Sequence, residues 1–196
     1  MRIPRLVVAV VVVVALLLPA TVVAQRPQVR RGFWLVAGAG PGTTISDCDE
    51  CALENRRDGS YTTIALGGTV GRNVLVGIEV NSWYLAEESG DQSLLGVLTV
   101  IQWYPWQAAG FHVRSGVGWG YARFGYRTEE EAGKADKLGI GLRFGAGWDL
   151  RVSRMISVSP FLGTHIAALG SMRVRDRPLT NLLSMSRQVG IGVTIH

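Results

Sequence analysis

Apolar and polar residues alternate one by one along most of this chain, in eight segments separated by connectors rich in Gly, Pro, Asp and Asn. This alternation is typical of a β-strand with two unlike faces, and no segment has the 3.6-residue stripe of an amphipathic helix. The segments are 33–40, 61–70, 74–84, 94–104, 111–123, 138–152, 156–167 and 183–195. Most exceed the roughly 5–6 residues of an average soluble strand and match the about 9–11 residues of a tilted membrane strand.

The sixth segment shows the pattern most clearly, because Gly, Arg and Asp occupy the face opposite its apolar residues. Its apolar face holds Leu138, Ile140, Leu142, Phe144, Ala146, Trp148 and Leu150. The mean hydropathy of the chain is +0.22, yet its one long apolar run lies at the N-terminus. In lipid, such a chain can satisfy its backbone only as a closed barrel. We therefore predict an all-β fold, an eight-stranded antiparallel up-and-down transmembrane β-barrel.

The connectors alternate between short and long. The short ones are 71–73, 105–110 and 151–155, and the long ones are 41–60, 85–93, 124–137 and 168–182. Bacterial outer-membrane barrels have short periplasmic turns and long outward loops. An even number of strands then predicts that both termini lie on the periplasmic side.

Aromatic residues lie toward the ends of the segments. They are Trp83, Tyr84, Trp103, Tyr104, Trp119, Tyr121 and Trp148. We expect them to form girdles at the two membrane interfaces, where amphipathic rings are favoured.

The first 24 residues predict a secretion signal. Arg2 and Arg5 precede an apolar core at 6–18, and small residues at 22–24 favour cleavage before Gln25. The core has about 13 residues, whereas a spanning helix needs roughly 20, so we prefer a signal peptide to a retained anchor. We expect a signal peptide at 1–24 and an outer-membrane β-barrel domain at 25–196.

Polar residues on the inward parity are the candidates for chemistry. They are Glu79, Asn81, Gln102, His112, Arg114, Arg143, Asp149, His165 and Gln188. An eight-stranded barrel is just wide enough to be filled by side chains, and an unpaired charge there is costly. We expect Glu79, Arg114 and Arg143, at similar depth, to form a lumen ion-pair network that plugs the barrel. A gate that opens to ions is the alternative.

Cys48 and Cys51 are the only cysteines and fall in the first long connector. Export would expose them to an oxidising compartment, so we predict a local disulfide. A metal site using neighbouring carboxylates, a redox pair and free thiols are alternatives. One CxxC offers too few ligands for a metal, and the βαβ context of a redox motif is missing. We therefore predict no metal site and no cofactor.

The signal, the eight alternating segments, the turn–loop asymmetry and the terminal strand together resemble the small outer-membrane β-barrel family that includes the membrane domain of OmpA. The resemblance spans 33–196. It implies a monomer in the outer membrane of a Gram-negative-type envelope, inserted by the barrel assembly machinery and in contact with outer-membrane lipid and lipopolysaccharide. Family members usually end in an aromatic residue, whereas this chain ends in His196.

No catalytic signature accompanies the pattern. His112 and Ser115 have opposite parity, and Ser157 and Ser159 are six or more residues from His165, so neither His has a nucleophile beside it on its own strand. The mature part has 18 Lys and Arg against 15 Asp and Glu, a surplus too small to indicate nucleic acid. We expect a non-enzymatic protein with a structural or surface-interaction role and little or no pore activity. The alternatives are an outer-membrane lipid-modifying enzyme and a soluble, lipocalin-like barrel that binds a small ligand.

Overall fold

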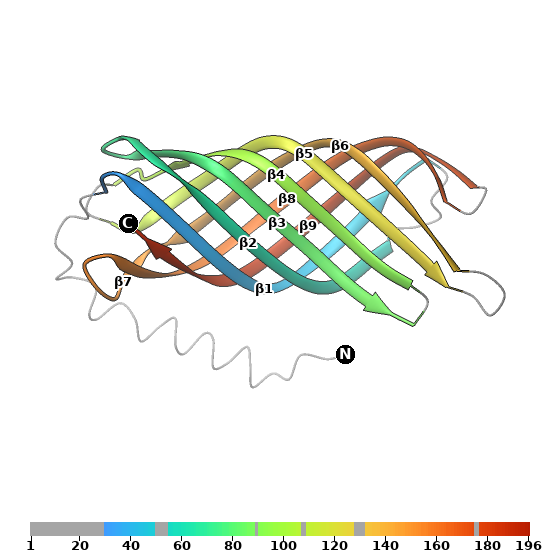
Figure 1. Cartoon of the computed structure of the whole chain (residues 1–196), viewed down its shortest axis with the longest axis horizontal. Helices are drawn as coiled ribbons and strands as arrows, with labels where there is room; N and C mark the ends of the chain where they lie inside the picture. The colour runs from blue at the N-terminus through green and yellow to red at the C-terminus, as the bar shows by residue number, and fades with distance from the viewer. Residues whose placement is uncertain (1–29, 50–54, 89, 107–108, 128–131, 175–176) are drawn as a thin grey trace.

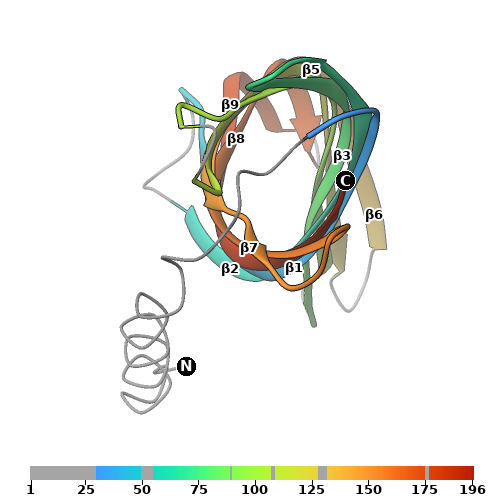
Figure 2. The same cartoon turned by 90° about the vertical axis from the view of Figure 1, so that its left-hand side faces the viewer.

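The computed structural model describes residues 30–49, 55–88, 90–106, 109–127, 132–174 and 177–196. They form one closed antiparallel barrel of eight long strands, with a two-residue strand, β7, beside it (Figures 1 and 2). The predicted all-β, eight-stranded fold is confirmed. None of the described residues belongs to a helix of the length and hydropathy needed to cross a membrane. The predicted signal peptide at 1–24 lies outside the described residues.

The strands follow one another around the ring in chain order. They are β1 (Phe33–Asp47), β2 (Asn55–Gly71), β3 (Val74–Glu87), β4 (Gly90–Trp103), β5 (Phe111–Arg127), β6 (Ala132–Trp148), β7 (Leu150–Arg151), β8 (Ile156–Val174) and β9 (Arg177–Ile195). Pairing of β6 with β8, and of β9 with β1, completes the ring.

The register determines the tilt of the strands. Following cross-strand partners from Thr43 through β9 and around the ring returns to β1 at Phe33, ten residues away. For eight strands, this stagger corresponds to a tilt of roughly 40° from the barrel axis. The lumen is accordingly narrow.

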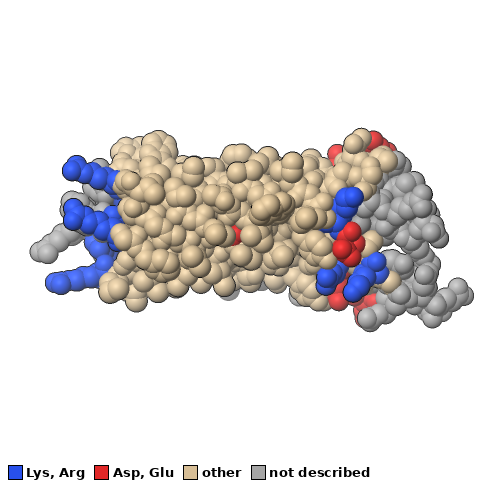
Figure 3. Space-filling view, turned by 45° about the horizontal axis from the view of Figure 1, so that its top comes forward, with Lys and Arg blue, Asp and Glu red and all other residues tan. Residues whose placement is uncertain are grey.

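The alternation separates an apolar outer wall from a polar interior. Ile64, Val117, Trp119, Ile140 and Ile191 are among the outward side chains, each more than half exposed. Figure 3 shows charged side chains gathered at the two ends of the barrel, with a largely uncharged wall between them.

The two ends differ. One end, which we call the turn end, holds the connections after β2, β4 and β7 together with Arg30 and His196. The opposite end, which we call the loop end, holds the ends of β1, β3, β5 and β8 (Figure 1). On the face shown in Figure 3, charged residues at the turn end are all basic, whereas basic and acidic residues mix at the loop end.

The predicted long connectors are wrong in extent, because much of each belongs to strands. β1 continues to Asp47 and β2 begins at Asn55, so most of the connector expected at 41–60 is paired. Hydrogen bonds between strands need only the backbone, and polar residues continue the pairing. The hydroxyl of Thr43 even donates to Asp58 Oδ1 across the hairpin, at 2.7 Å.

Two of the seven aromatic residues assigned to girdles are also placed differently. Trp83 and Tyr104 are 2% and 0% exposed inside the lumen, because both have the inward parity. The Nε1–H of Trp83 donates to the carbonyl oxygen of Gly42 at 3.0 Å. Tyr84, Trp103, Trp119 and Trp148 do lie exposed on the outer wall.

Inward glycines leave space for the larger lumen side chains. A Cβ at Gly96 would lie 2.8 Å from Asn81 Oδ1 and 2.8 Å from His165 Cε1. At Gly68, which faces outward, an added Cβ meets nothing within 4 Å. Packing therefore requires glycine at position 96, whereas no contact requires glycine at position 68.

These contacts predict that the same substitution changes stability at one of the two glycines and not at the other. Gly96→Val should destabilise the barrel by about 2 kcal/mol, because overpacking displaces Asn81 and His165. Gly68→Val, the matched control, should leave stability within about 0.5 kcal/mol of wild type. Urea unfolding followed by gel mobility of the unheated protein measures both. Equal stability of the two variants would contradict the packed interior.

Candidate functional site

A carboxylate lies between two guanidinium groups at the middle of the lumen. Glu79 Oε2 lies 2.9 Å from Arg114 Nη1, and Glu79 Oε1 lies 2.5 Å from Arg143 Nε. The amide of Asn81 also donates to Glu79 Oε1, at 3.1 Å. Glu79, Arg114 and Arg143 are 0%, 7% and 2% exposed. The structure thus brings together the three residues of the expected ion-pair network.

The local sequence explains how two long cations fit at one level. Arg114 of β5 is paired with Gly145 of β6, and Arg143 of β6 is paired with Gly116 of β5. Each Arg therefore has a residue without a side chain beside it, and its own side chain can turn toward β3. The alternating Gly and Arg of these strands allow the network to form.

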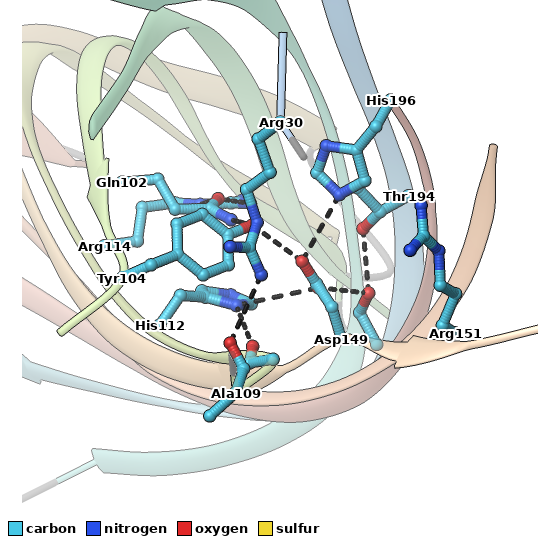
Figure 4. Close-up of polar contacts among 12 residues, drawn as sticks. Arg30, Gln102, Tyr104, Ala109, His112, Arg114, Asp149, Arg151, Thr194 and His196 are labelled. Atoms are coloured by element: carbon cyan, nitrogen blue, oxygen red, sulfur yellow. Dashed lines mark hydrogen bonds and ion pairs between the residues drawn. The ribbon is translucent and has the colours of Figure 1, made fainter. Parts of the chain in front are cut away.

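A chain of hydrogen bonds leads from this network to the turn end (Figure 4). Arg114 Nε donates to Gln102 Oε1 at 2.9 Å, and the Gln102 amide donates to the hydroxyl of Tyr104. That hydroxyl in turn donates to Asp149 Oδ2 at 2.6 Å. The ionic centre and the turn end are therefore joined by continuous polar contacts.

Asp149 lies at the turn end, just after the last residue of β6, and contacts several polar side chains. Ser159 donates to its Oδ1 at 2.7 Å, and His196 Nε2 lies 3.4 Å from Oδ2. Burial raises the pKa of the Asp149 carboxyl, but the nearby imidazoles of His196 and His112, together with hydrogen bonds from Tyr104 and Ser159, outweigh burial and lower the pKa below its usual value. Asp149 therefore remains ionised.

Arg30 closes the turn end from the N-terminal side. Its guanidinium carbon lies 3.4 Å from the centroid of the Tyr104 ring, and its Nη2 donates to the carbonyl oxygen of Ala109 at 3.3 Å. The residue is 4% exposed, although it precedes the first strand. Burial lowers the pKa of this guanidinium, and Tyr104 and Asp149 oppose that effect. The segment before β1 thus contributes a cation to the mouth of the barrel.

Apolar side chains fill the rest of the lumen in two clusters. The cluster toward the loop end includes Tyr61, Trp83 and Leu94, and the cluster toward the turn end includes Trp34 and Leu98. A cavity beside Arg114 and Arg143 has a volume of about 20 Å³, room for about one water molecule. Among the described residues, charged and apolar side chains thus follow one another along the lumen.

All nine polar residues assigned to the inward face are buried. The contributions of Arg30, Tyr104, Ser159 and His196 were missed. The parity of Tyr104 could have revealed its position, since it lies two residues beyond Gln102 on the same face. Arg30 lies outside the alternating segments, so no periodic signal identifies it.

Cys48 is buried in the loop-end cluster, at 7% exposure. Its expected partner, Cys51, lies outside the described residues, so the disulfide remains a prediction. Among the residues that the structure describes, no three His, Cys, Asp or Glu side chains are grouped as a metal site would require.

Within the described strands, His165 of β8 is paired directly with Ser186 of β9. Both are 1% exposed, and neither His165 Nε2 nor Ser186 Oγ has a hydrogen-bond partner. The hydrogen bond of a nucleophile–base pair is therefore not formed, and a substrate would have no access to either side chain.

The chain forms a closed ring of eight antiparallel strands, with an apolar outer wall and a filled, charged lumen. This is the fold of the small eight-stranded outer-membrane β-barrels. Solved structures agree. Neisserial surface protein A is 14% identical, with a TM-score of 0.55, and the match covers 84% of this chain and 96% of that protein. Ail, the attachment invasion locus protein of Yersinia pestis, is 11% identical, with a TM-score of 0.60, and the match covers 84% of this chain and 99% of Ail. Ail in complex with the heparin analogue sucrose octasulfate aligns with a TM-score of 0.59 at 11% identity, over 83% of this chain and 99% of that one.

At these identities the likeness shows the shared fold alone. A scan against protein-family models found no match, and a search of curated proteins found none either.

The central ion pairs predict a large effect of removing one charge. Glu79→Gln keeps the shape of the side chain but leaves Arg114 and Arg143 without their counter-charge, so it should destabilise the barrel by about 3 kcal/mol or more. Glu87→Gln, the control, removes a carboxylate that pairs with Arg57 at 2.7 Å near the loop end, where both side chains are about one-third exposed. That change should cost about 1 kcal/mol or less. Urea unfolding in detergent compares the two variants, and similar losses would contradict the central role of Glu79.

Proposed function

We propose that this chain is an integral outer-membrane protein of a Gram-negative-type envelope, with a structural or surface-interaction role and little or no pore activity. The observation that carries the proposal is the inverted distribution of its residues, with apolar side chains exposed and charged ones enclosed. A barrel in water would expose that wall at great cost, whereas acyl chains accept it.

The height of the apolar wall fits a bilayer. Leu138 and Trp148 are both exposed on β6 and lie ten residues apart. At about 3.3 Å per residue and a tilt of roughly 40°, they are about 25 Å apart along the barrel axis. This agrees with the apolar band of about 25 Å around outer-membrane barrels.

In the proposed orientation, the turn end faces the periplasm. Short turns occupy the periplasmic side of bacterial barrels, and the described termini, Arg30 and His196, both lie at this end. The predicted cleavage before Gln25 would release the barrel on that side. The protein would be a monomer, delivered by the barrel assembly machinery and surrounded by outer-membrane lipid and lipopolysaccharide.

The two alternatives receive less support from the geometry. A soluble, lipocalin-like barrel needs a polar exterior and an apolar cavity, whereas here the exterior is apolar and the lumen is filled by charged and aromatic side chains. A lipid-modifying enzyme needs a nucleophile and base that lipid can reach, and His165 and Ser186 are both buried.

Membrane residence predicts how the protein fractionates. Expressed without a tag in a Gram-negative host, it should sediment with outer membranes, remain there in alkaline carbonate, and dissolve only in detergent. Unheated and boiled samples should then migrate differently in a gel, because the closed barrel resists the detergent. Recovery of the folded chain in detergent-free buffer would overturn the proposal.

A filled lumen predicts negligible current across planar bilayers. Wild-type protein should show no stepwise conductance, because Arg30, the Glu79 ion pairs and the cluster around Trp83 block the axis in series. Glu79→Gln, in protein that still shows the folded gel mobility, distinguishes a permanent plug from a gate. Currents as low as those of wild type support the plug, whereas stepwise openings in this variant alone would establish the gate.

A further inference from the structure

Arg187 departs from the apolar character of the outer wall. It is exposed on the outer face of β9, between Met185 and Val189 of the same face. Val189 and Ile191, next toward the turn end, are 63% and 64% exposed. Within the described part of the chain, the Arg187 guanidinium has no ion pair or hydrogen bond. The guanidinium groups of Arg114 and Arg143, in contrast, are paired with Glu79.

Two threonines lie on either side of Arg187. Thr43 of β1 and Thr164 of β8 are its direct cross-strand partners, and all three residues share the outward parity. The Thr43 hydroxyl donates to Asp58 Oδ1, so the Thr164 hydroxyl is the donor that remains beside the guanidinium. A cation with an adjacent hydroxyl donor is a suitable partner for a phosphate group.

A groove in the wall extends from this position. It has a volume of about 740 Å³ and is bordered by Arg187, Thr43 and Thr164 together with Phe144, Leu162 and Val189. Phe144 and Leu162 are 54% and 60% exposed. Toward the turn end, the lining is therefore apolar, as the surface under an acyl chain would be.

Arg187 lies in the loop-end half of the apolar band. It lies eight residues from Ile195, the last residue of β9. This spacing is about 20 Å along the barrel axis at a tilt of roughly 40°. Through the cross-strand partners Thr164 and Phe144, Arg187 lies about 9 Å on the turn-end side of Leu138, the loop-end edge of the band. The long stem of Arg187 can extend among the acyl chains toward the loop end and bring the guanidinium to the lipid phosphates.

We propose that this groove binds an anionic lipid of the leaflet at the loop end, one whose phosphate is not neutralised by a cation in its own headgroup. The extended Arg187 side chain would hold the phosphate, and an acyl chain would lie along Val189, Leu162 and Phe144. Arg56, also on the border of the groove, adds a second cation. Its contact with Asp58 is an exposed 3.7 Å ion pair, which leaves it available to the lipid. The proposal rests on the membrane residence proposed above and adds a specific lipid site to it.

The test measures retention of lipid A by the folded, detergent-purified protein, using native mass spectrometry. Wild type should retain one lipid A molecule more firmly than it retains phosphatidylcholine. Arg187→Gln should lower the retained fraction about tenfold, because it removes the charge-assisted hydrogen bonds to phosphate. Arg187→Lys, which keeps the charge but not the planar fork, should give an intermediate loss.

Arg123→Gln is the matched control, because Arg123 is also exposed near the loop end but donates to Tyr121 away from the groove. It should retain lipid A as wild type does. Equal retention by Arg187→Gln and Arg123→Gln would overturn the site, as would equal retention of phosphatidylcholine. Full displacement of lipid A by an equal concentration of inorganic phosphate would also overturn it, because the acyl chain would then contribute nothing. Each of these results leaves the fractionation test unaffected, so the lipid site can fail while membrane residence stands.

Discussion

A carboxylate enclosed at the middle of a narrow barrel is stable only if cations share the enclosure, and the structure of this protein is arranged around that requirement. Arg114 forms an ion pair with one carboxylate oxygen of Glu79, and Arg143 forms an ion pair with the other. The mutual attraction of the three groups offsets the cost of removing them from water, which each would otherwise bear alone. The space for both Arg side chains comes from Gly116 and Gly145, their cross-strand partners. Electrostatics and packing thus depend on the same few positions.

The side chains that fill the lumen change in character along its axis, so its two ends are occupied by different kinds of residue. Toward the loop end, Trp83 and Leu94 exclude water as an apolar core does. Toward the turn end, Gln102 and Tyr104 extend the polar network from Arg114 to Asp149. An ion that entered from the turn end would first meet Arg30, and one that entered from the loop end would first lose its hydration among aromatic rings. In the proposed plugged lumen, either route would carry a barrier before the central charges are reached.

Alternation along the sequence was enough to predict the fold and the side of the wall on which each polar residue lies. Glu79 and Arg143 could be assigned to the lumen by parity, and to similar depths by counting from the turns. The contribution of Arg30 could not be predicted, because its position over Tyr104 depends on a segment with no periodicity. Strand ends were underestimated for a related reason. Toward the loop end the outward residues become polar, as at Thr43 and Asp58, while the backbone pairing continues.

The arginines of the barrel illustrate two ways of stabilising the same charged group beside acyl chains. Arg114 and Arg143 point inward, and the chain itself supplies their counter-charge. Arg187 points outward, with Thr43 and Thr164 beside it and no carboxylate on either paired position. A guanidinium in such a wall still favours an anion, and in a membrane the anions that its long side chain can reach are lipid phosphates. The inward arginines thus require a partner from the fold, whereas the outward one requires a partner from the surroundings, so the wall near Arg187 is where this barrel would discriminate among lipids.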